Sequence, residues 1–358
     1  MTTITKKSTS LNEAVSSELK KGFDLNKFKD KKLLNSNVKF KEQKWIPVSE
    51  ALSDIISLPG IPMGHITLLR GHSDTGKTTA LIEAAVNAQK AGILPVLIVT
   101  EMKFDFGHLK TMGFDVNEVI DPATGEIQNY EGFFIYADRS SLQSVEDVAA
   151  FILDLLDEQA KGNLPYDLLF LWDSVGSIPC KMSIEKSSNS NEWNAGAMSQ
   201  QFGNFVNQKI VLSRKENSPY TNTFVCVNKV WVEKPSLPME QPKMKNKGGN
   251  TMFFDASLIV TFGNIANAGT NKIKAVKDKK DVEFTKRTKV SVDKNHINGI
   301  STRGSIIMTA HGFIKDTPLS VDKYKKEHAD EWAKILGGTN FKIVTEDEAN
   351  GEVDTSED

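Results

Sequence analysis

Residues 71–78 of the chain read Gly-His-Ser-Asp-Thr-Gly-Lys-Thr, and they connect a predicted strand to a predicted helix. An apolar run at 65–70 precedes it, and an Ala-rich segment at 78–91 follows it, closed by Gly92. The first pattern predicts a buried strand and the second a helix. Glycines between a strand and a helix let backbone N–H groups turn toward phosphate oxygens, and the helix directs its positive end at the same anion. The stretch therefore predicts a phosphate-binding loop for a nucleotide.

Each part of this loop has an expected role toward ATP and Mg²⁺. The Lys77 ammonium is expected to neutralise β- and γ-phosphate oxygens, and the Thr78 hydroxyl is expected to ligate Mg²⁺. The predicted nucleotide contacts are Gly71, His72, Ser73, Asp74, Thr75, Gly76, Lys77, Thr78 and Thr79.

Two carboxylates follow apolar runs downstream of the loop. Asp173 comes directly after the run at 168–172, and an acid at the carboxyl end of a central parallel strand lies in the crevice where ligands bind. We expect it to hold Mg²⁺ through water. Glu101 follows the run at 94–100 and is expected to orient and deprotonate the attacking water. On spacing alone, Glu101 is also compatible with a surface residue that caps the next helix.

Short apolar runs alternate with helical patterns through much of the chain, the helical ones at 106–112, 142–160 and 197–214. Further apolar runs lie at 133–137 and 224–227. This alternation predicts an α/β fold with a mostly parallel sheet covered on both faces. After residue 249 the stretches 256–262, 272–277, 288–292 and 305–309 are expected to extend the sheet with antiparallel strands. Residues 117–132 are expected to form an inserted turn or hairpin.

The charge is distributed unevenly although the formal net charge is only −2. Residues 1–50 carry eleven Lys against six acids, and residues 345–358 carry seven acids and no base. The N-terminal stretch lacks the apolar core of a signal peptide, and no apolar run approaches the ~18 residues of a membrane helix. We expect reduced cysteines and a cytoplasmic protein with no membrane partner.

Four regions are predicted. Residues 1–44 form a basic helical extension, which is either a solvated helix or an oligomerisation arm that docks on a neighbouring subunit. Residues 45–315 form the ATPase core. Residues 316–344 form a small C-terminal region of helix or strand, and the acidic tail at 345–358 is expected to be disordered.

Together these motifs resemble the RecA family, and within it the UvsX-type recombinases of T-even phages. The resemblance spans roughly residues 45–315. It includes Lys-Trp-Ile-Pro at 44–47, Gly-Ile-Pro-Met-Gly-His-Ile-Thr at 60–67 and Leu-Trp-Asp-Ser-Val at 171–175. It implies a RecA-like ATPase core and DNA-dependent hydrolysis of ATP to ADP and phosphate. It also implies a helical filament on single-stranded DNA that pairs with homologous duplex in recombination and repair. A phage source would place it in the bacterial host cytoplasm.

The resemblance also implies roles for single residues. Glu101 matches the catalytic glutamate, and Asp105 and His108 fall where the family frames adenine. Lys229 stands at a γ-phosphate sensor position where bacterial relatives carry an amide. The subunit-interface residues are Phe254, which is expected to pack on the neighbour, and Lys294 and His296, which are expected to reach the neighbour's ATP. His296 departs from the lysine of the family pattern.

Two segments are expected to contact DNA. The Pro-rich, aperiodic segment at 231–247 corresponds to the family's loop for single-stranded DNA, although a merely solvated loop has the same composition. The segment at 178–194 corresponds to an earlier DNA loop. The expected contacts are Lys181, Lys186, Trp231, Lys234, Lys243, Lys245, Lys247, Gly248 and Gly249.

Two other functions fit the motifs. A RecA-like hexameric helicase or KaiC-like motor shares the ATPase core, but Gly-Gly-Asn at 248–250 favours the recombinase. A non-hydrolysing, ATP-gated DNA-binding protein would not need both Glu101 and Asp173. The predicted partners are single- and double-stranded DNA and further copies of the chain, and the resemblance leaves room for a recombination mediator and a single-stranded DNA-binding protein.

Overall fold

A computed structural model describes residues 24, 27, 39–101, 105–187, 190–233, 243–246, 248–263, 272–277 and 280–328. It contains two compact units, Met1–Lys41 with Lys215–Asn217 and Glu42–Arg214 with Ser218–Asp358. In the first unit, Phe40 and Lys215 form an antiparallel bridge. The helix expected near the N-terminus and the acidic tail at 345–358 lie outside the described residues, so those two predictions stay predictions. All that follows concerns the second unit.

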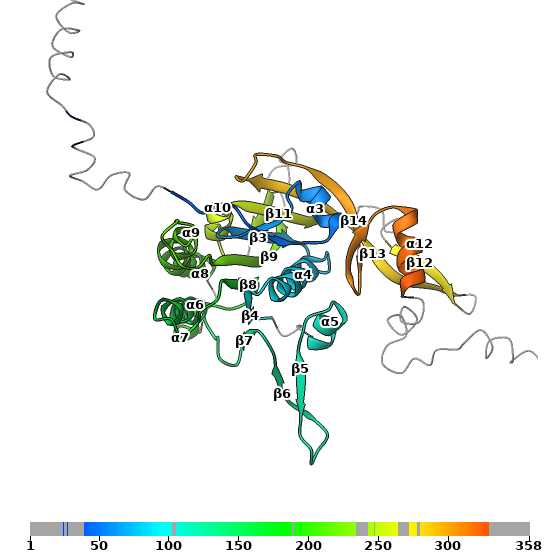
Figure 1. Cartoon of the computed structure of the whole chain (residues 1–358), viewed down its shortest axis with the longest axis horizontal. Coiled ribbons are helices and arrows are strands. Elements are labelled where there is room, and N and C mark those ends of the chain that lie inside the picture. The colour runs from blue at the N-terminus through cyan, green and yellow to red at the C-terminus, as the bar shows by residue number, and fades with distance from the viewer. Residues whose placement is uncertain are drawn as a thin grey trace, which may run out of the picture. The chain divides into compact units, whose positions relative to one another are not determined.

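The core of this unit is a sheet in which the described residues form eleven strands (Figure 1). Six neighbouring strands run parallel, in the order β11 (Leu258–Gly263), β3 (Ile66–Gly71), β9 (Thr223–Glu233), β8 (Leu168–Val175), β4 (Leu94–Val99) and β7 (Ile135–Asp138). Antiparallel strands extend it beyond β11: β13 (Lys280–Asn295), β14 (Arg303–Thr309) and β15 (Gly312–Lys315). The predicted fold class, α/β with a mostly parallel sheet and an antiparallel extension, is confirmed.

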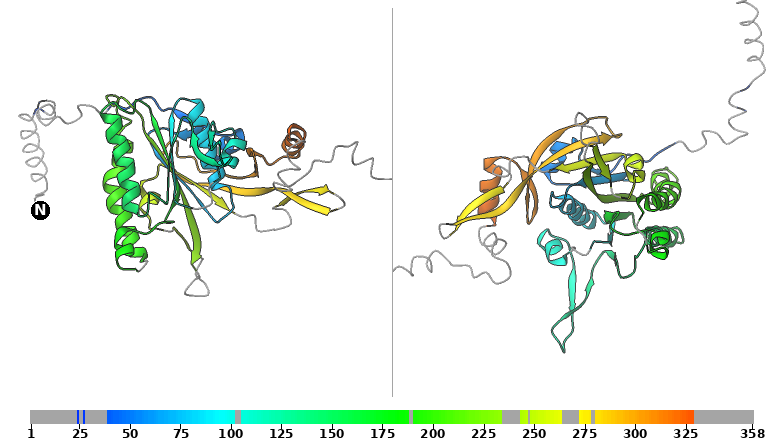
Figure 2. Two further views of the ribbon diagram at one scale, coloured as in Figure 1. Left: turned by 90° about the horizontal axis from the view of Figure 1, so that it is seen from below. Right: turned by 180° about the vertical axis from the view of Figure 1, so that it is seen from behind.

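Helices cover both faces of the sheet, as Figure 2 shows. On one face α4 (Lys77–Lys90) packs its alanines and Leu81 against alternate strand residues such as Leu69 and Leu171. On the other, α6 (Val145–Ala160) and the π-helix η1 (Ser199–Val206) pack against the strand residues in between, including Trp172. Because both faces are covered, β8 and β4 are buried along their whole length, which explains their continuous apolar sequences.

The helix predicted at 142–160 begins at Val145 because Ser144 caps it. The Asp147 backbone N–H donates to Ser144 Oγ at 3.2 Å, and the Ser144 N–H donates back to the Asp147 carboxylate at 2.9 Å. The helical pattern at 197–214 is part of a longer helical segment, in which α8 (Asn191–Met198) precedes η1 and α9 (Asn207–Leu212) follows it.

Smaller elements surround the sheet. The prediction of a hairpin at 117–132 is confirmed: β5 (Asn117–Ile120) and β6 (Ile127–Glu131) pair antiparallel and project from the core (Figure 1). The other elements are β1 (Trp45–Pro47), β2 (Gly60–Pro62), α3 (Glu50–Ile56), α5 (Phe106–Thr111), α7 (Lys181–Glu185), β10 (Lys243–Asn246), α10 (Thr251–Asp255), β12 (Lys272–Lys277) and α12 (Pro318–Glu327). Within the described ranges, none of the helices has both the length and the apolar character that crossing a bilayer requires.

Candidate nucleotide site

The predicted phosphate loop joins the end of β3 to the start of α4. Gly76 precedes the helix with φ of +98°, and a Cβ atom at this position would lie 2.9 Å from the Phe313 ring. Only glycine adopts this backbone readily, and the close ring leaves no room for a side chain. Because glycine cannot cap the helix, the first N–H groups of α4 receive no side-chain cap. These groups suit an anion.

Lys77 is held inside the loop. Its ammonium donates to the His72 carbonyl at 2.5 Å, and the Thr75 hydroxyl donates to the same oxygen at 2.8 Å. The side chain is buried, and burial lowers the Lys77 pKa to about 8, against the opposing charge of Asp173. The loop thus keeps a cation close to its own backbone, where a phosphate group would be a stronger partner.

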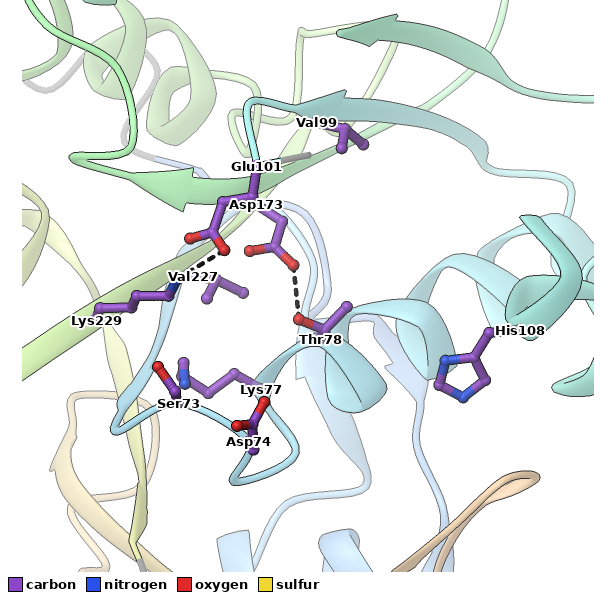
Figure 3. A pocket seen from close by; sticks show the side chains of 10 residues that line it. All are labelled: Ser73, Asp74, Lys77, Thr78, Val99, Glu101, His108, Asp173, Val227 and Lys229. Carbon is purple, nitrogen blue, oxygen red and sulfur yellow. Dashed lines mark hydrogen bonds and ion pairs between the residues drawn. The ribbon is translucent and has the colours of Figure 1, made fainter. Parts of the chain in front are cut away.

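Asp173 and Thr78 meet across the cavity, as Figure 3 shows. The Thr78 hydroxyl donates to Asp173 Oδ2 at 2.7 Å. Burial raises the Asp173 pKa, although the Thr78 hydrogen bond and the Lys77 charge oppose the rise. A hydroxyl and a carboxylate are hard oxygen ligands, so this pair fits Mg²⁺ chemically. The peptide bond that follows Asp173 is cis.

Glu101 lies beside this pair and is held by two donors. The Lys229 ammonium donates to one carboxylate oxygen at 2.8 Å, and the Ser174 hydroxyl donates to the other (Figure 3 shows the first bond). Burial alone would raise the Glu101 pKa, but these hydrogen bonds and the charges of Lys229 and Lys77 lower it below its ordinary value. The carboxylate is therefore kept ionised and can accept a proton only from a strongly polarised group.

Thr100 connects the two strands that carry these acids. Its buried hydroxyl accepts from Trp172 Nε1 at 2.9 Å and from the Ser174 backbone N–H at 3.2 Å. In the fold it fixes Ser174, which in turn holds Glu101.

A cavity of about 270 Å³ joins these groups. Most of its lining was predicted from the sequence, while two apolar strand residues, Val99 at the end of β4 and Val227 within β9, were not. Their signal was weak, since each is only one more residue of a buried run. The lining residues are Ser73, Asp74, Lys77, Thr78, Val99, Glu101, His108, Asp173, Val227 and Lys229 (Figure 3). Of the other predicted contacts, Thr79 is buried within α4 and Gly71 ends β3.

His108 and Asp105, the predicted adenine residues, both belong to the start of α5. His108 lines the cavity, and its pKa is lowered by burial and by the nearby His311, against the charge of Asp105. Asp105 caps α5 by accepting from the Gly107 N–H at 2.9 Å. Two residues near the site were missed, because neither lies in a recognisable motif. His311 contacts the Tyr324 hydroxyl at 3.0 Å, and Lys286 donates to the Asp74 carbonyl at 2.9 Å.

The segment at 231–247 was predicted to be a loop, and this is wrong for its described residues 231–233 and 243–246, which lie in strands. Strand β9 runs through Trp231 to Glu233, and β10 returns antiparallel, with Lys243 opposite Glu233 and Lys245 opposite Trp231. Pairing satisfies the backbone groups of both ends, which residue composition did not indicate. Lys234 and Lys247 lie outside the described residues.

The turn after β10 carries the Gly-Gly pair. Gly249 has φ of +91°, and a Cβ atom there would lie 2.7 Å from the Cβ of Ala195. Glycine is required because the chain passes close to α8 with a left-handed backbone. Gly248 is buried beside it. The pair thus has a structural reason that is independent of DNA contact.

The expectation of a loop over 178–194 is also wrong in part, because α7 spans Lys181–Glu185 and α8 begins at Asn191. Lys181 forms an ion pair with Asp147 at 3.2 Å. The Lys186 ammonium lies 4.9 Å from the centroid of the Trp193 ring. Both lysines therefore already have partners within the chain.

The predicted interface residues lie away from the cavity of their own chain. Phe254, on α10, is 68% exposed. The Lys294 ammonium donates to the carbonyl of Phe254 at 2.7 Å and to that of Phe253 at 3.3 Å. His296 is exposed and its backbone N–H donates to the Ser257 carbonyl at 2.8 Å.

Comparison with curated proteins finds similarity to RecA. The RecA protein of Sulfurimonas denitrificans is 24% identical over 212 residues, which are 59% of this chain and 52% of the relative. The RecA protein of Mycoplasma genitalium is 32% identical over 108 residues, which cover 28% and 31% of the two chains. That of Ureaplasma parvum serovar 3 is 35% identical over 77 residues, or 21% and 23%.

The matched part thus spans about half of the first relative and a quarter to a third of the others. No protein-family model matches the chain. The likeness that these comparisons find is to RecA proteins. This chain is therefore similar to RecA proteins over part of its length, with an α/β fold consistent with a RecA-like core.

Proposed function

We propose that the chain is an ATP-dependent DNA recombinase of the RecA family and, more closely, of the UvsX type. The observation that carries the proposal is the meeting of Lys77, the Thr78–Asp173 pair and the ionised Glu101 in one cavity. The likeness to RecA proteins supports the choice of recombination among the functions of such ATPases.

The loop is suited to ATP binding. Lys77 exchanges the His72 carbonyl for the β- and γ-phosphate oxygens, and the uncapped N-terminus of α4 faces the same charge. Thr78 and Asp173 would hold Mg²⁺, which when bound neutralises charge on the phosphates. Val99 and Val227 contribute apolar surface to the cavity, and His108 offers a ring for the base.

Glu101 is suited to hydrolysis. Its carboxylate orients a water molecule and accepts one of its protons as the water oxygen bonds to the γ-phosphorus. The bond to the β–γ bridging oxygen breaks, so that ADP and phosphate leave. Lys229 holds the carboxylate at 2.8 Å, and Ser174 fixes its other oxygen. Lys229 lines the same cavity as Lys77, so the phosphates of ATP would compete with Glu101 for this cation.

Strand β9 offers a physical link from hydrolysis to DNA. Lys229 lies on β9 directly before Val230, where the antiparallel β9–β10 hairpin begins. DNA held at this hairpin by the predicted residues would restrain the strand that positions Lys229, and through it Glu101. The proposal therefore includes hydrolysis that depends on single-stranded DNA, with double-stranded DNA as the second substrate.

The proposal also includes a helical filament of this chain in the cytoplasm, a bacterial host cytoplasm if the protein is phage-encoded. A recombination mediator and a single-stranded DNA-binding protein are its further proposed partners. Phe254, which is exposed on α10, and Lys294, whose ammonium rests on the Phe254 carbonyl, are the residues proposed for assembly.

The test measures ATP hydrolysis by the full chain with and without single-stranded DNA, and images the same samples by electron microscopy. We expect a rise in turnover of at least tenfold, with filaments on the DNA. An unchanged rate with added DNA contradicts the recombinase. Closed rings would instead favour a hexameric helicase or KaiC-like motor. Thr78→Ala serves as the control that removes the predicted metal ligand.

A further inference from the structure

Arg70 is the last residue before the phosphate loop and is the centre of a polar network at the edge of the parallel strands. Its Nε donates to Thr261 Oγ1 at 2.8 Å, and its Nη2 donates to Asp293 Oδ2 at 2.5 Å. The guanidinium carbon also lies 5.0 Å from the centroid of the Phe253 ring. The Arg70 side chain is 11% exposed and the Asp293 side chain 28%, so the ion pair is partly shielded from solvent.

A β-bulge places Asp293 in this network. On strand β11, Ile259 pairs with Lys294 and Val260 pairs with Val292, which leaves Asp293 as the extra residue of β13. A bulge re-aims the side chains around it. Besides Arg70, the Asp293 carboxylate accepts from Thr261 Oγ1 at 2.6 Å and from Ser291 Oγ at 3.0 Å. The strand is therefore held at the bulge by three donors.

The residue after the bulge is Lys294, which donates to the carbonyls of Phe253 and Phe254 at the end of α10. A helix carboxyl end attracts a cation, so the bulge and α10 together determine where this lysine stands. Phe253 contacts both Arg70 and Phe254. The Arg70 guanidinium lies over its ring, and the Phe254 ring packs against it edge-on with 5.8 Å between the centroids.

We propose that Arg70 and Asp293 are positioning residues that hold Lys294 and Phe254 ready for the neighbouring subunit. The inference rests on the proposed function, in which Lys294 completes the neighbour's ATP site. We call the group Arg70, Thr261, Asp293 and Phe253 the clamp. Because Arg70 directly precedes Gly71, the clamp ties the phosphate loop of one subunit to the lysine that this subunit offers to the next.

The clamp predicts a defect that appears in the neighbour and not in the altered subunit itself. Arg70→Met is expected to bind a fluorescent ATP analogue within about twofold of the parent, since Arg70 does not line the cavity. Its ATP turnover in the assembled state is expected to fall at least tenfold. Asp293→Asn is expected to behave alike. Lys209→Met removes an exposed ion pair with Asp157 (3.0 Å) and is the matched control, with unchanged turnover.

Mixing two variants separates this role from a general loss of structure. Glu101→Gln subunits have an inactive site but an intact clamp, and Arg70→Met subunits have the reverse. A mixture is expected to recover at least a quarter of the parent turnover per Arg70→Met subunit, because intact clamps then face active sites. Mixing Arg70→Met with the double variant Arg70→Met/Glu101→Gln should give no recovery.

Three results overturn the inference. The first is parent-like turnover of Arg70→Met, and the second is a loss that mixing does not restore. The third is turnover per subunit of the parent chain that does not depend on protein concentration. This result would contradict assembly itself, and with it the proposed function, whereas the first two results contradict only the role of Arg70. If Arg70→Met melts far below the parent, Arg70→Lys replaces it: this variant keeps the charge but loses one of the two hydrogen bonds, and the same recovery on mixing is expected.

Discussion

The phosphate cavity and the sheet edge at α10 differ in the partners of their charged side chains. In the cavity, Lys229 pairs with Glu101 at 2.8 Å and Thr78 donates to Asp173 at 2.7 Å, so acids and donors are matched inside one chain. At the edge, Lys294 rests on backbone carbonyls and Phe254 is 68% exposed. In the cavity the charged groups find their partners within the folded chain, whereas at the edge the proposed function assigns the missing partner to a second copy of the chain.

The largest effect is expected from Glu101→Gln in the cavity. The amide keeps the shape and loses the proton acceptor, so kcat should fall by roughly 10²–10⁴-fold while ATP binding stays within a few-fold. Steady-state hydrolysis and equilibrium binding of a fluorescent ATP analogue measure the two quantities. Glu118→Gln, on the projecting hairpin and paired with Lys110, is the matched control. Turnover above a tenth of the parent rate would remove Glu101 as the general base.

At the edge, Phe254→Ala is expected to weaken assembly without unfolding the chain. An exposed aromatic contributes little to the fold, but as a buried anchor between subunits its loss costs about 2 kcal/mol, or roughly 30-fold in the assembly constant. Light scattering or sedimentation measures assembly, and a thermal melt measures the fold. Leu319→Ala, 79% exposed on α12, is the control and should leave assembly unchanged. An equal loss in both variants contradicts a specific interface.

Lys229→Met is expected to change how kcat depends on pH. The Lys229 hydrogen bond and charge oppose the effect of burial and lower the Glu101 pKa, so removing them raises that pKa. A base must be ionised to act, and therefore the acid limb of the kcat profile should move to higher pH. Lys110→Met, at the remote Glu118 pair, should leave the profile in place. An unshifted acid limb would show that Lys229 does not set the pKa of the group that limits hydrolysis.

The smallest effect is a proton taken up on ATP binding. Burial lowers the pKa of Lys77 to about 8, and phosphate oxygens favour its charged form, so binding raises this pKa. Between pH 8 and 9 we expect uptake of up to about one proton per ATP, and affinity that decreases as pH rises. Calorimetry in buffers of different ionisation enthalpy measures the uptake, and Lys77→Met should abolish it. An absence of proton uptake would show that the lysine is already fully charged without ATP.

Much of the cavity could be predicted because its residues lie in motifs attached to buried strands. Lys77, Thr78 and Asp173 are placed by strand ends, and strand ends follow from apolar runs. The strand lengths were less predictable. β13 runs from Lys280 to Asn295, whereas only residues 288–292 have a strand-like sequence, because pairing with β12 and β14 satisfies a backbone whose residues are largely charged.

The sequence by itself determined the phosphate loop, the two acids and the α/β class, since these depend on local spacing and on the alternation of apolar segments. Only the tertiary structure decided the partners of these groups. It forms the hydrogen bonds between Lys229 and Glu101 and between Thr100 and Ser174. It also pairs Arg70 with Asp293, 223 residues later in the chain. Strand order and one β-bulge determine which side chains become neighbours. Neither can be predicted from the residue spacing within a single segment, because both depend on how distant segments pair.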